Sequence, residues 1–297
     1  MMDHAALQSM LANRMQADVA CPECGPNRRD PSNRKRRVMR LWQLDHGISY
    51  CCARCGVSGF AVANSASTRH LEPAERAAID RKFAEARRRD EESRRRKQAL
   101  AAALWRQSID ARHTWAESYL RLRGIELPDE DYVRRRTFRF HPHCPRPDLP
   151  AGPAMLVAFE PILTEIPDDP FLDPPVTAIH RIWGRGHRKA MLGPTGGCAV
   201  KITPDERVLG SLAICEGVET GLKLFERGTS VWALGSAGAI EAFPVLERVR
   251  QLTVFADNDA SGRGLEAAKR CAARWAEAGR RVVIFMRCEE GRDYGEA

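Results

Sequence analysis

The chain has 297 residues, a hydrophobic content of 43% and a formal net charge of +8. This length allows two or three domains, and the excess of arginine favours a polyanionic partner, although an ordinary soluble surface also fits the charge. No stretch approaches the roughly 18 apolar residues of a membrane span, and the N-terminus lacks the apolar core of a signal peptide. We therefore expect a cytoplasmic protein without a membrane partner, in which ten cysteines indicate metal binding rather than disulfides.

Two Cys-x-x-Cys pairs, each followed by glycine, come after a short amphipathic helix expected over 4–16. The segment between them alternates like a β-hairpin, with strands over 38–44 and 47–51. Four thiolates from two tight turns satisfy tetrahedral Zn²⁺, and the glycines let backbone N–H groups approach sulfur. Cys51 remains an alternative ligand, because Cys-x-x-x-Cys spacing also occurs. The predicted zinc ligands are Cys21, Cys24, Cys52 and Cys55.

This zinc ribbon resembles the N-terminal zinc domain of bacterial and phage primases. Those domains often carry a histidine among the ligands, whereas this chain has four cysteines. The resemblance implies that the ribbon binds a single-stranded template. Arg36 and Arg37 lie between the two cysteine pairs with Trp42 nearby, and basic groups beside an aromatic ring suit single-stranded nucleic acid. The alternative is a solvated hairpin in which Trp42 closes a small core.

A long helical pattern runs from Glu72 to about Ser118, after a small, polar linker over 61–70. Pro73 suits the first turn, and the glycine of YLRLRG (119–124) is a C-cap for the region. The middle of the pattern mixes arginines with acids. Such a run is typical of a solvated helix face supported by i,i+4 pairs, so we assign it no function.

The next region reads as a β-rich platform, with strands predicted over 134–143, 154–159 and 176–183. The GPTGG segment (193–197) either lets a phosphate approach the backbone or forms an ordinary tight turn. It lacks the ending of a P-loop. The cationic residues that we expect to contact phosphate or template here are Arg181, Lys189 and Lys201.

Acidic residues follow two short apolar runs near the C-terminus: Glu216 follows LAIC, and Asp257 and Asp259 follow LTVFA. The carboxyl ends of parallel strands share one edge of a sheet, so these acids are expected to meet there. Asp257 and Asp259 lie two residues apart and point the same way in extended chain. Carboxylates suit Mg²⁺ or Mn²⁺. An acid at a strand end is otherwise often a helix N-cap.

CEGVETGL and FADNDASGRG resemble the Toprim domain, most closely that of primases from phages, plasmids and other mobile elements. The resemblance covers roughly Val208 to the end and implies strands at 211–215, 230–234, 252–256 and 281–286, with a final helix over 264–278. Primase-like Toprim domains often carry a further aspartate after the last strand, and Asp293 in GRDYGE occupies the corresponding place. The second acid that usually follows it in the family is replaced by Glu296 in this chain. The run from YLRLRG to AVKI is similar to the module that precedes Toprim in such proteins.

Together these features predict an α/β protein with four parts. They are a zinc ribbon (1–64), a charged helical linker (65–118), an α+β middle module (119–205) and a Toprim domain (206–297) with a parallel sheet and flanking helices.

The resemblance implies a DNA primase, a nucleotidyltransferase that makes short primers on single-stranded DNA from nucleoside triphosphates. Asp257 and Asp259 would hold one or two divalent ions, Glu216 would be a ligand or a proton acceptor, and Asp293 would complete the acidic pocket. No ATPase motif is present, so any replicative helicase is expected to be a separate chain. Two alternatives remain: a Toprim metal-dependent nuclease, and a non-catalytic DNA-binding replication or recombination factor.

Overall fold

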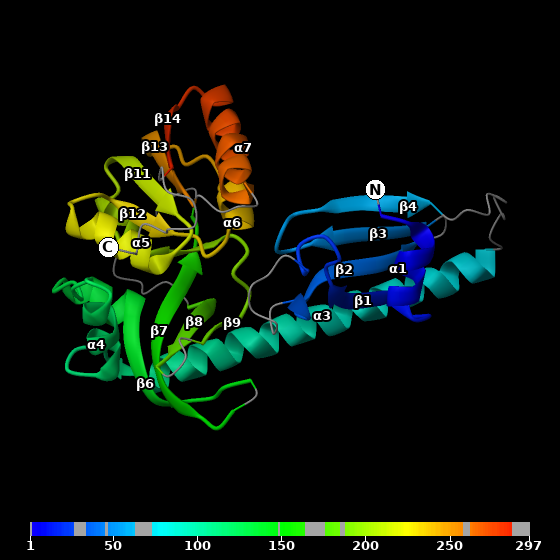
Figure 1. Cartoon of the computed structure of the whole chain (residues 1–297), viewed down its shortest axis with the longest axis horizontal. Helices are drawn as coiled ribbons and strands as arrows, with labels where there is room; N and C mark the ends of the chain where they lie inside the picture. The colour runs from blue at the N-terminus through cyan, green and yellow to red at the C-terminus, as the bar shows by residue number, and fades with distance from the viewer. Residues whose placement is uncertain are drawn as a thin grey trace. The chain divides into compact units, whose positions relative to one another are not determined.

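The computed structural model describes residues 2–26, 34–44, 47–62, 73–147, 149–163, 176–184, 188–257 and 262–286. The backbone divides into two compact units, Met1–Ser93 and Arg94–Ala297, and each is treated by itself (Figure 1). Across the described ranges, no helix is long and apolar enough to cross a membrane. The four-part division predicted from the sequence stays a prediction.

The first unit contains one short helix and an antiparallel sheet in the order β1-β2-β3-β4. Helix α1 ends earlier than expected, because Ala12 and Asn13 adopt positive φ angles of 48° and 60°. Strands β2 and β3 form the predicted hairpin. The flanking strands were not predicted, since QADVA and SGFAV are short and only weakly alternating. The elements are α1 (His4–Leu11), β1 (Gln16–Ala20), β2 (Arg37–Leu44), β3 (Gly47–Cys52) and β4 (Ser58–Val62).

The predicted helical region over 72–118 is two helices rather than one. Helix α3 (Pro73–Gln107) stops at Ser108, whose N–H and hydroxyl both donate to the carbonyl of Trp105. A short strand, β5 (Ile109–Asp110), follows. Helix α4 (Trp115–Leu122) then begins at Thr114, whose hydroxyl accepts from the N–H of Ala116 at 3.1 Å. The sequence prediction was wrong beyond 107 because it did not detect these stop and start residues.

The three predicted middle strands are present, but two of them begin later than predicted, and β9 and β10 were not predicted. Residues Val133–Thr137 form a π-helical turn, so the strand predicted from 134 begins only at Phe138. Arg134 explains the turn: its guanidinium folds back to the carbonyl of Asp129 and the carboxylate of Asp131. The strands are β6 (Phe138–Cys144), β7 (Gly152–Pro161), β8 (Ala178–Trp183), β9 (Lys189–Leu192) and β10 (Cys198–Lys201).

The C-terminal part alternates strand and helix, as the resemblance implied. Strands β11, β12, β13 and β14 pair in parallel in the order β14-β13-β11-β12. Helix α5 packs on one face, and α6 and α7 pack on the other. The bounds are β11 (Gly210–Cys215), α5 (Val218–Glu226), β12 (Val231–Ala233), α6 (Ala237–Glu241), β13 (Val249–Ala256), α7 (Arg263–Glu277) and β14 (Arg281–Met286).

Strand β7 joins the middle strands to the parallel strands in one ten-stranded sheet (Figure 1). Its C-terminal end pairs with β10, and β10 pairs antiparallel with β12. Alternate β7 residues pack on opposite faces. Val157 and Phe159 share a core with α4 and α5, while Leu156 and Ala158 share a core with α3. Helix α3 therefore covers the opposite face of β7 from α4 and α5.

Candidate functional site

Glu216 and Asp257 line one cavity of about 170 Å³. Glu216 directly follows β11 and Asp257 directly follows β13, and these neighbouring parallel strands are in register at Cys215 and Phe255. Gly235, which follows β12, also lines the cavity. The structure thus brings the two acids to the shared carboxyl edge that the sequence predicted.

A glycine in the first turn of α7 allows the chain to pass close to Asp257. A Cβ atom on Gly264 would lie 2.5 Å from the carbonyl oxygen of Asp257 and 3.3 Å from its nitrogen. Real Cβ atoms essentially never approach backbone this closely, so a larger residue would push Asp257 away from its place. Asp259 and Asp293, the other two predicted acids, lie outside the described residues.

The cavity also contains a partly buried ion pair that the sequence did not predict. Lys189 on β9 lies with its Nζ 2.5 Å from Glu219 Oε1, and the hydroxyl of Tyr119 on α4 donates to the same oxygen at 3.0 Å. Burial opposes ionisation of Glu219, but the charge of Lys189 and the hydrogen bonds to the carboxylate, including those from Lys189 and Tyr119, together hold the pKa of this carboxyl below its usual value. Lys189 was predicted to bind phosphate. Glu219 could have been noticed as a second acid in CEGVETG.

His180 on β8 is a further cavity residue without a sequence prediction. Burial, together with the positive charge of Lys189, lowers its pKa to about 4. The imidazole is therefore neutral near pH 7, with one nitrogen able to donate and the other able to accept a hydrogen bond. The alternation of VTAIHRIW is consistent with this placement, because His180 lies on the same face of the sheet as its partners Val157 and Met191.

Arg181 and Lys201, predicted to contact phosphate or template, do not line the cavity. Arg181 is buried on the other face of β8, where it stacks over Trp183 and donates to the carbonyl of Pro145. Lys201 is also buried, pairs with Asp205 and lies 5.1 Å from the Trp232 ring centroid. We correct both assignments to packing roles, because neither cation is accessible.

Comparison with known proteins identifies the region of the chain that contains Glu216 and Asp257. The family model of the Toprim domain matches residues 211–296. The chain contains a C-terminal Toprim domain. Toprim domains bind divalent metal ions in nucleic-acid-processing proteins such as primases, nucleases and recombination proteins. A second model, described as a domain of unknown function (DUF7146), matches residues 95–210. No curated protein and no solved structure matches the chain.

The boundary between the two matched regions falls inside the ten-stranded sheet. Strand β10 belongs to the DUF7146 region, yet it pairs with β12 of the Toprim domain. The cavity is shared in the same way, since Phe159, His180 and Lys189 come from the first region, and Glu216 and Asp257 from the second. The acidic cavity of this Toprim domain is therefore completed by residues outside it.

In the first unit, the four predicted zinc ligands form one cluster. The sulfur atoms of Cys21, Cys24, Cys52 and Cys55 all lie within 4.8 Å of one another. Two of the pairs are separated by 3.7 Å (Cys21 and Cys55) and 3.9 Å (Cys24 and Cys52). Four sulfurs about 2.3 Å from a tetrahedral ion lie roughly 3.8 Å apart. The donor set and its spacing therefore fit Zn²⁺.

The cluster decides between Cys51 and Cys52. Cys52 is buried in it, while Cys51 is exposed at the neighbouring position of β3, so the two side chains point to opposite faces. The backbone N–H of Arg54 donates to the sulfur of Cys52 at 3.4 Å, a contact that suits a thiolate ligand.

The residues predicted to bind nucleic acid on the ribbon differ in accessibility. Arg36 and Arg37 are exposed, and Trp42 is half-buried on β2. Arg40, which lies between Arg37 and Trp42 in the sequence, forms ion pairs with Asp18 and Asp90 at 2.7 and 3.1 Å. Of the residues predicted to bind nucleic acid on the ribbon, Arg36 and Arg37 are therefore the exposed cations.

Proposed function

We propose that this protein is a DNA primase, which synthesises short primers on single-stranded DNA from nucleoside triphosphates. The observation that carries the proposal is that Glu216 and Asp257 line one cavity at the carboxyl ends of neighbouring parallel strands. The Toprim match and the four-cysteine cluster in the same chain support it. Fold alone would not justify an activity, so the acidic residues bear the argument.

In this proposal, Asp257 and Asp259 hold Mg²⁺ or Mn²⁺, with Glu216 as a further ligand or as the acceptor of the 3′-hydroxyl proton. Asp293 completes the acidic pocket. Carboxylate oxygens are hard ligands that fit these ions. The bound metal supplies Lewis-acid stabilisation of the triphosphate and its leaving group.

Lys189 supplies the cation that faces a phosphate in the cavity. The Lys189 side chain keeps about a third of its exposure, whereas the Glu219 side chain is almost fully buried. Glu219 and Tyr119 therefore hold Lys189 in position, and Lys189 keeps N–H donors for a ligand. Neutral His180 adds a hydrogen-bonding group to the same wall.

On the ribbon, zinc held by the four cysteines would fix the hairpin that carries the exposed Arg36 and Arg37. These arginines are proposed to contact the phosphates of the single-stranded template, with Trp42 beside them. A replicative helicase, if one takes part, would be a separate chain.

The test is primer synthesis on single-stranded DNA with labelled ribo- or deoxynucleotides and Mg²⁺ or Mn²⁺. We expect Asp257→Asn to abolish short products while leaving template affinity unchanged, because the substitution removes a metal ligand but little volume. Glu247→Gln is the matched control, an exposed acid of the Toprim domain outside the cavity. Unchanged synthesis by the Asp257→Asn protein would contradict the proposal.

The same experiment separates the two alternatives. Metal-dependent nicking of supercoiled DNA, lost in Asp257→Asn and without primer synthesis, would assign a nuclease. Tight DNA binding with neither activity would assign a non-catalytic replication or recombination factor.

A further inference from the structure

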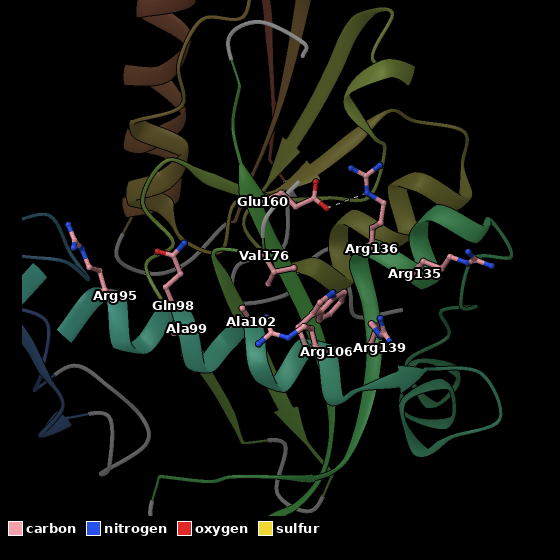
Figure 2. Close-up of a pocket in the computed structure, with 11 residues that line it drawn as sticks. Arg95, Gln98, Ala99, Ala102, Arg106, Arg135, Arg136, Arg139, Glu160 and Val176 are labelled. Carbon is pink, nitrogen blue, oxygen red and sulfur yellow. Dashed lines mark ion pairs between the residues drawn. The ribbon is translucent and has the colours of Figure 1, made fainter. Parts of the chain in front are cut away.

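A second cavity, of about 650 Å³, lies between the C-terminal half of α3 and strands β6 and β7 (Figure 2). Its lining is unusually cationic, with five arginines against one carboxylate. We call it the arginine groove. Its charged residues are Arg95, Arg106, Arg135, Arg136, Arg139 and Glu160.

Two of these arginines shape the walls. Arg136 approaches Glu160 at 3.8 Å, and Figure 2 shows the two side chains directed toward one another. Arg139 lies 5.5 Å from the ring centroid of Trp105 and donates to the carbonyl of Ser108. Burial lowers the pKa of Arg139, although the group stays charged near pH 7.

The other three arginines line the rim. Arg95 and Arg106 are exposed on α3, and Arg135 retains 78% of its side-chain exposure. In Figure 2, Arg95 and Arg135 lie toward opposite ends of the groove. An α-helix rises about 1.5 Å per residue, so Arg95 and Arg106 are separated by about 16 Å along α3. That length corresponds to about five stacked nucleotides at about 3.4 Å each.

Between the charged groups the lining is apolar apart from Gln98. Ala99, Ala102, Trp105 and Val176 supply it, and they come from α3 and the segment before β8. A cationic rim over an apolar floor suits a ligand that carries phosphates and exposes flat rings. A duplex would offer only phosphates, because its bases are stacked inside, and it would gain little from the floor.

We propose that the arginine groove binds single-stranded DNA, with phosphates at the rim and bases over the floor. This inference rests on the proposed function in one respect, namely that the strand is the template. The groove and the acidic cavity lie on opposite faces of β7, since Phe159 lines the cavity and Glu160 lines the groove. The groove therefore holds the strand and takes no part in the chemistry.

The test measures binding of a fluorescent ten-nucleotide oligo(dT) to the full zinc-loaded chain by anisotropy, without nucleotides or added Mg²⁺. The variant is Arg106→Gln with Arg135→Gln. Arg121→Gln is the matched control, because Arg121 and Arg135 are similarly exposed (73% and 78%) and each pairs with an acid four residues earlier. Arg121 lies on α4, outside the groove.

Each lost phosphate contact should reduce the slope of log affinity against log salt by about 0.7, so the double variant should lose about 1.4. At 0.1 M salt this corresponds to roughly 10- to 30-fold weaker binding. The control should bind like the unmodified chain. Equal slopes for all three proteins would overturn the inference.

Three further measurements separate binding of a single strand from a structural effect and from other ligands. Glu160→Gln removes the one carboxylate and should strengthen binding, the opposite sign from a loss of folding, which thermal unfolding would report. A tenfold excess of ATP should not displace the oligonucleotide; displacement would indicate a free-nucleotide site and overturn the inference, as would equal affinity for a ten-base-pair duplex. The binding assay requires no primer synthesis. A protein that makes no primers could therefore still bind the oligonucleotide in the groove, and failure of the proposed function would be distinguished from failure of this inference.

Discussion

Lys189 Nζ donates to Glu219 Oε1 at 2.5 Å, which ties strand β9 to helix α5 at the acidic cavity. Tyr119 on α4 donates to the same oxygen at 3.0 Å. The three residues are up to 100 positions apart in the chain, and Glu219 alone belongs to the Toprim match. The ion pair therefore couples the DUF7146 region to the Toprim domain at the site where we propose that nucleotides bind.

Replacing Lys189 with methionine should destabilise the protein by about 2 kcal/mol. The change leaves the Glu219 carboxylate buried without its cation, which is costly, but the partial exposure of Lys189 reduces the loss below that of a fully buried pair. Adding Glu219→Gln should restore part of the stability. Urea unfolding of both single variants and the double variant measures the coupling. Additive effects would show that the pair contributes nothing jointly.

His180 should make stability depend on pH between about 6.5 and 4. Its pKa falls from 6.5 to about 4 on folding, so the unfolded chain binds more protons in this range and acid favours unfolding. The loss amounts to about 3 kcal/mol at full protonation. In His180→Gln the free energy of unfolding should vary less over this range. Tryptophan fluorescence mainly reports the unfolding of the Arg94–Ala297 unit, because all tryptophans of the chain except Trp42 lie in it. An unchanged slope would contradict the assignment.

Adjacent cysteines give a test of the zinc site. Cys52→Ser should abolish stoichiometric zinc binding, because it removes a sulfur of the cluster, whereas Cys51→Ser should retain about one zinc per chain. A chelator that removes zinc should unfold the ribbon, since structural zinc sites contribute folding energy directly. Zinc released on thiol modification measures the stoichiometry, and circular dichroism measures the unfolding. Equal zinc content in both variants would refute the four-ligand assignment.

Gly264→Ala should displace Asp257. The new methyl group would meet the Asp257 carbonyl oxygen at 2.5 Å, and relieving that overlap should cost about 1–3 kcal/mol. Gly238→Ala is the control, since the nearest atom to its Cβ, Ser236 Oγ, is 4.0 Å away. The control should be neutral or slightly stabilised, as expected for glycine to alanine in a helix. Thermal unfolding compares them, and metal-dependent protection from unfolding should weaken in Gly264→Ala alone.

Much of the secondary structure followed from local pattern. The apolar runs over 212–215 and 252–255 predicted the ends of β11 and β13 from their residues, whereas β12 and β14 were implied by the resemblance to the Toprim domain. The helix over 72–118 was predicted as continuous because no glycine or proline follows Pro73 in this stretch to mark an end. Its end at Ser108 coincides with two hydrogen bonds, from the N–H and the hydroxyl of Ser108 to the carbonyl of Trp105.

For the candidate site, the sequence alone determined which carboxylates end neighbouring strands and which cysteines have zinc spacing, since both depend on short-range order along the chain. Only the tertiary structure decided that Lys189, Glu219 and His180 meet at the cavity, because they lie on separate elements joined through β7 and β10. It also decided that Arg181 and Lys201 are buried packing residues, and that arginines from α3 and from the chain around β6 line one groove. The sequence shows which residues are charged. Which of these charges pair with one another, and which stay exposed, depends on the packing of strands and helices that are far apart in the chain.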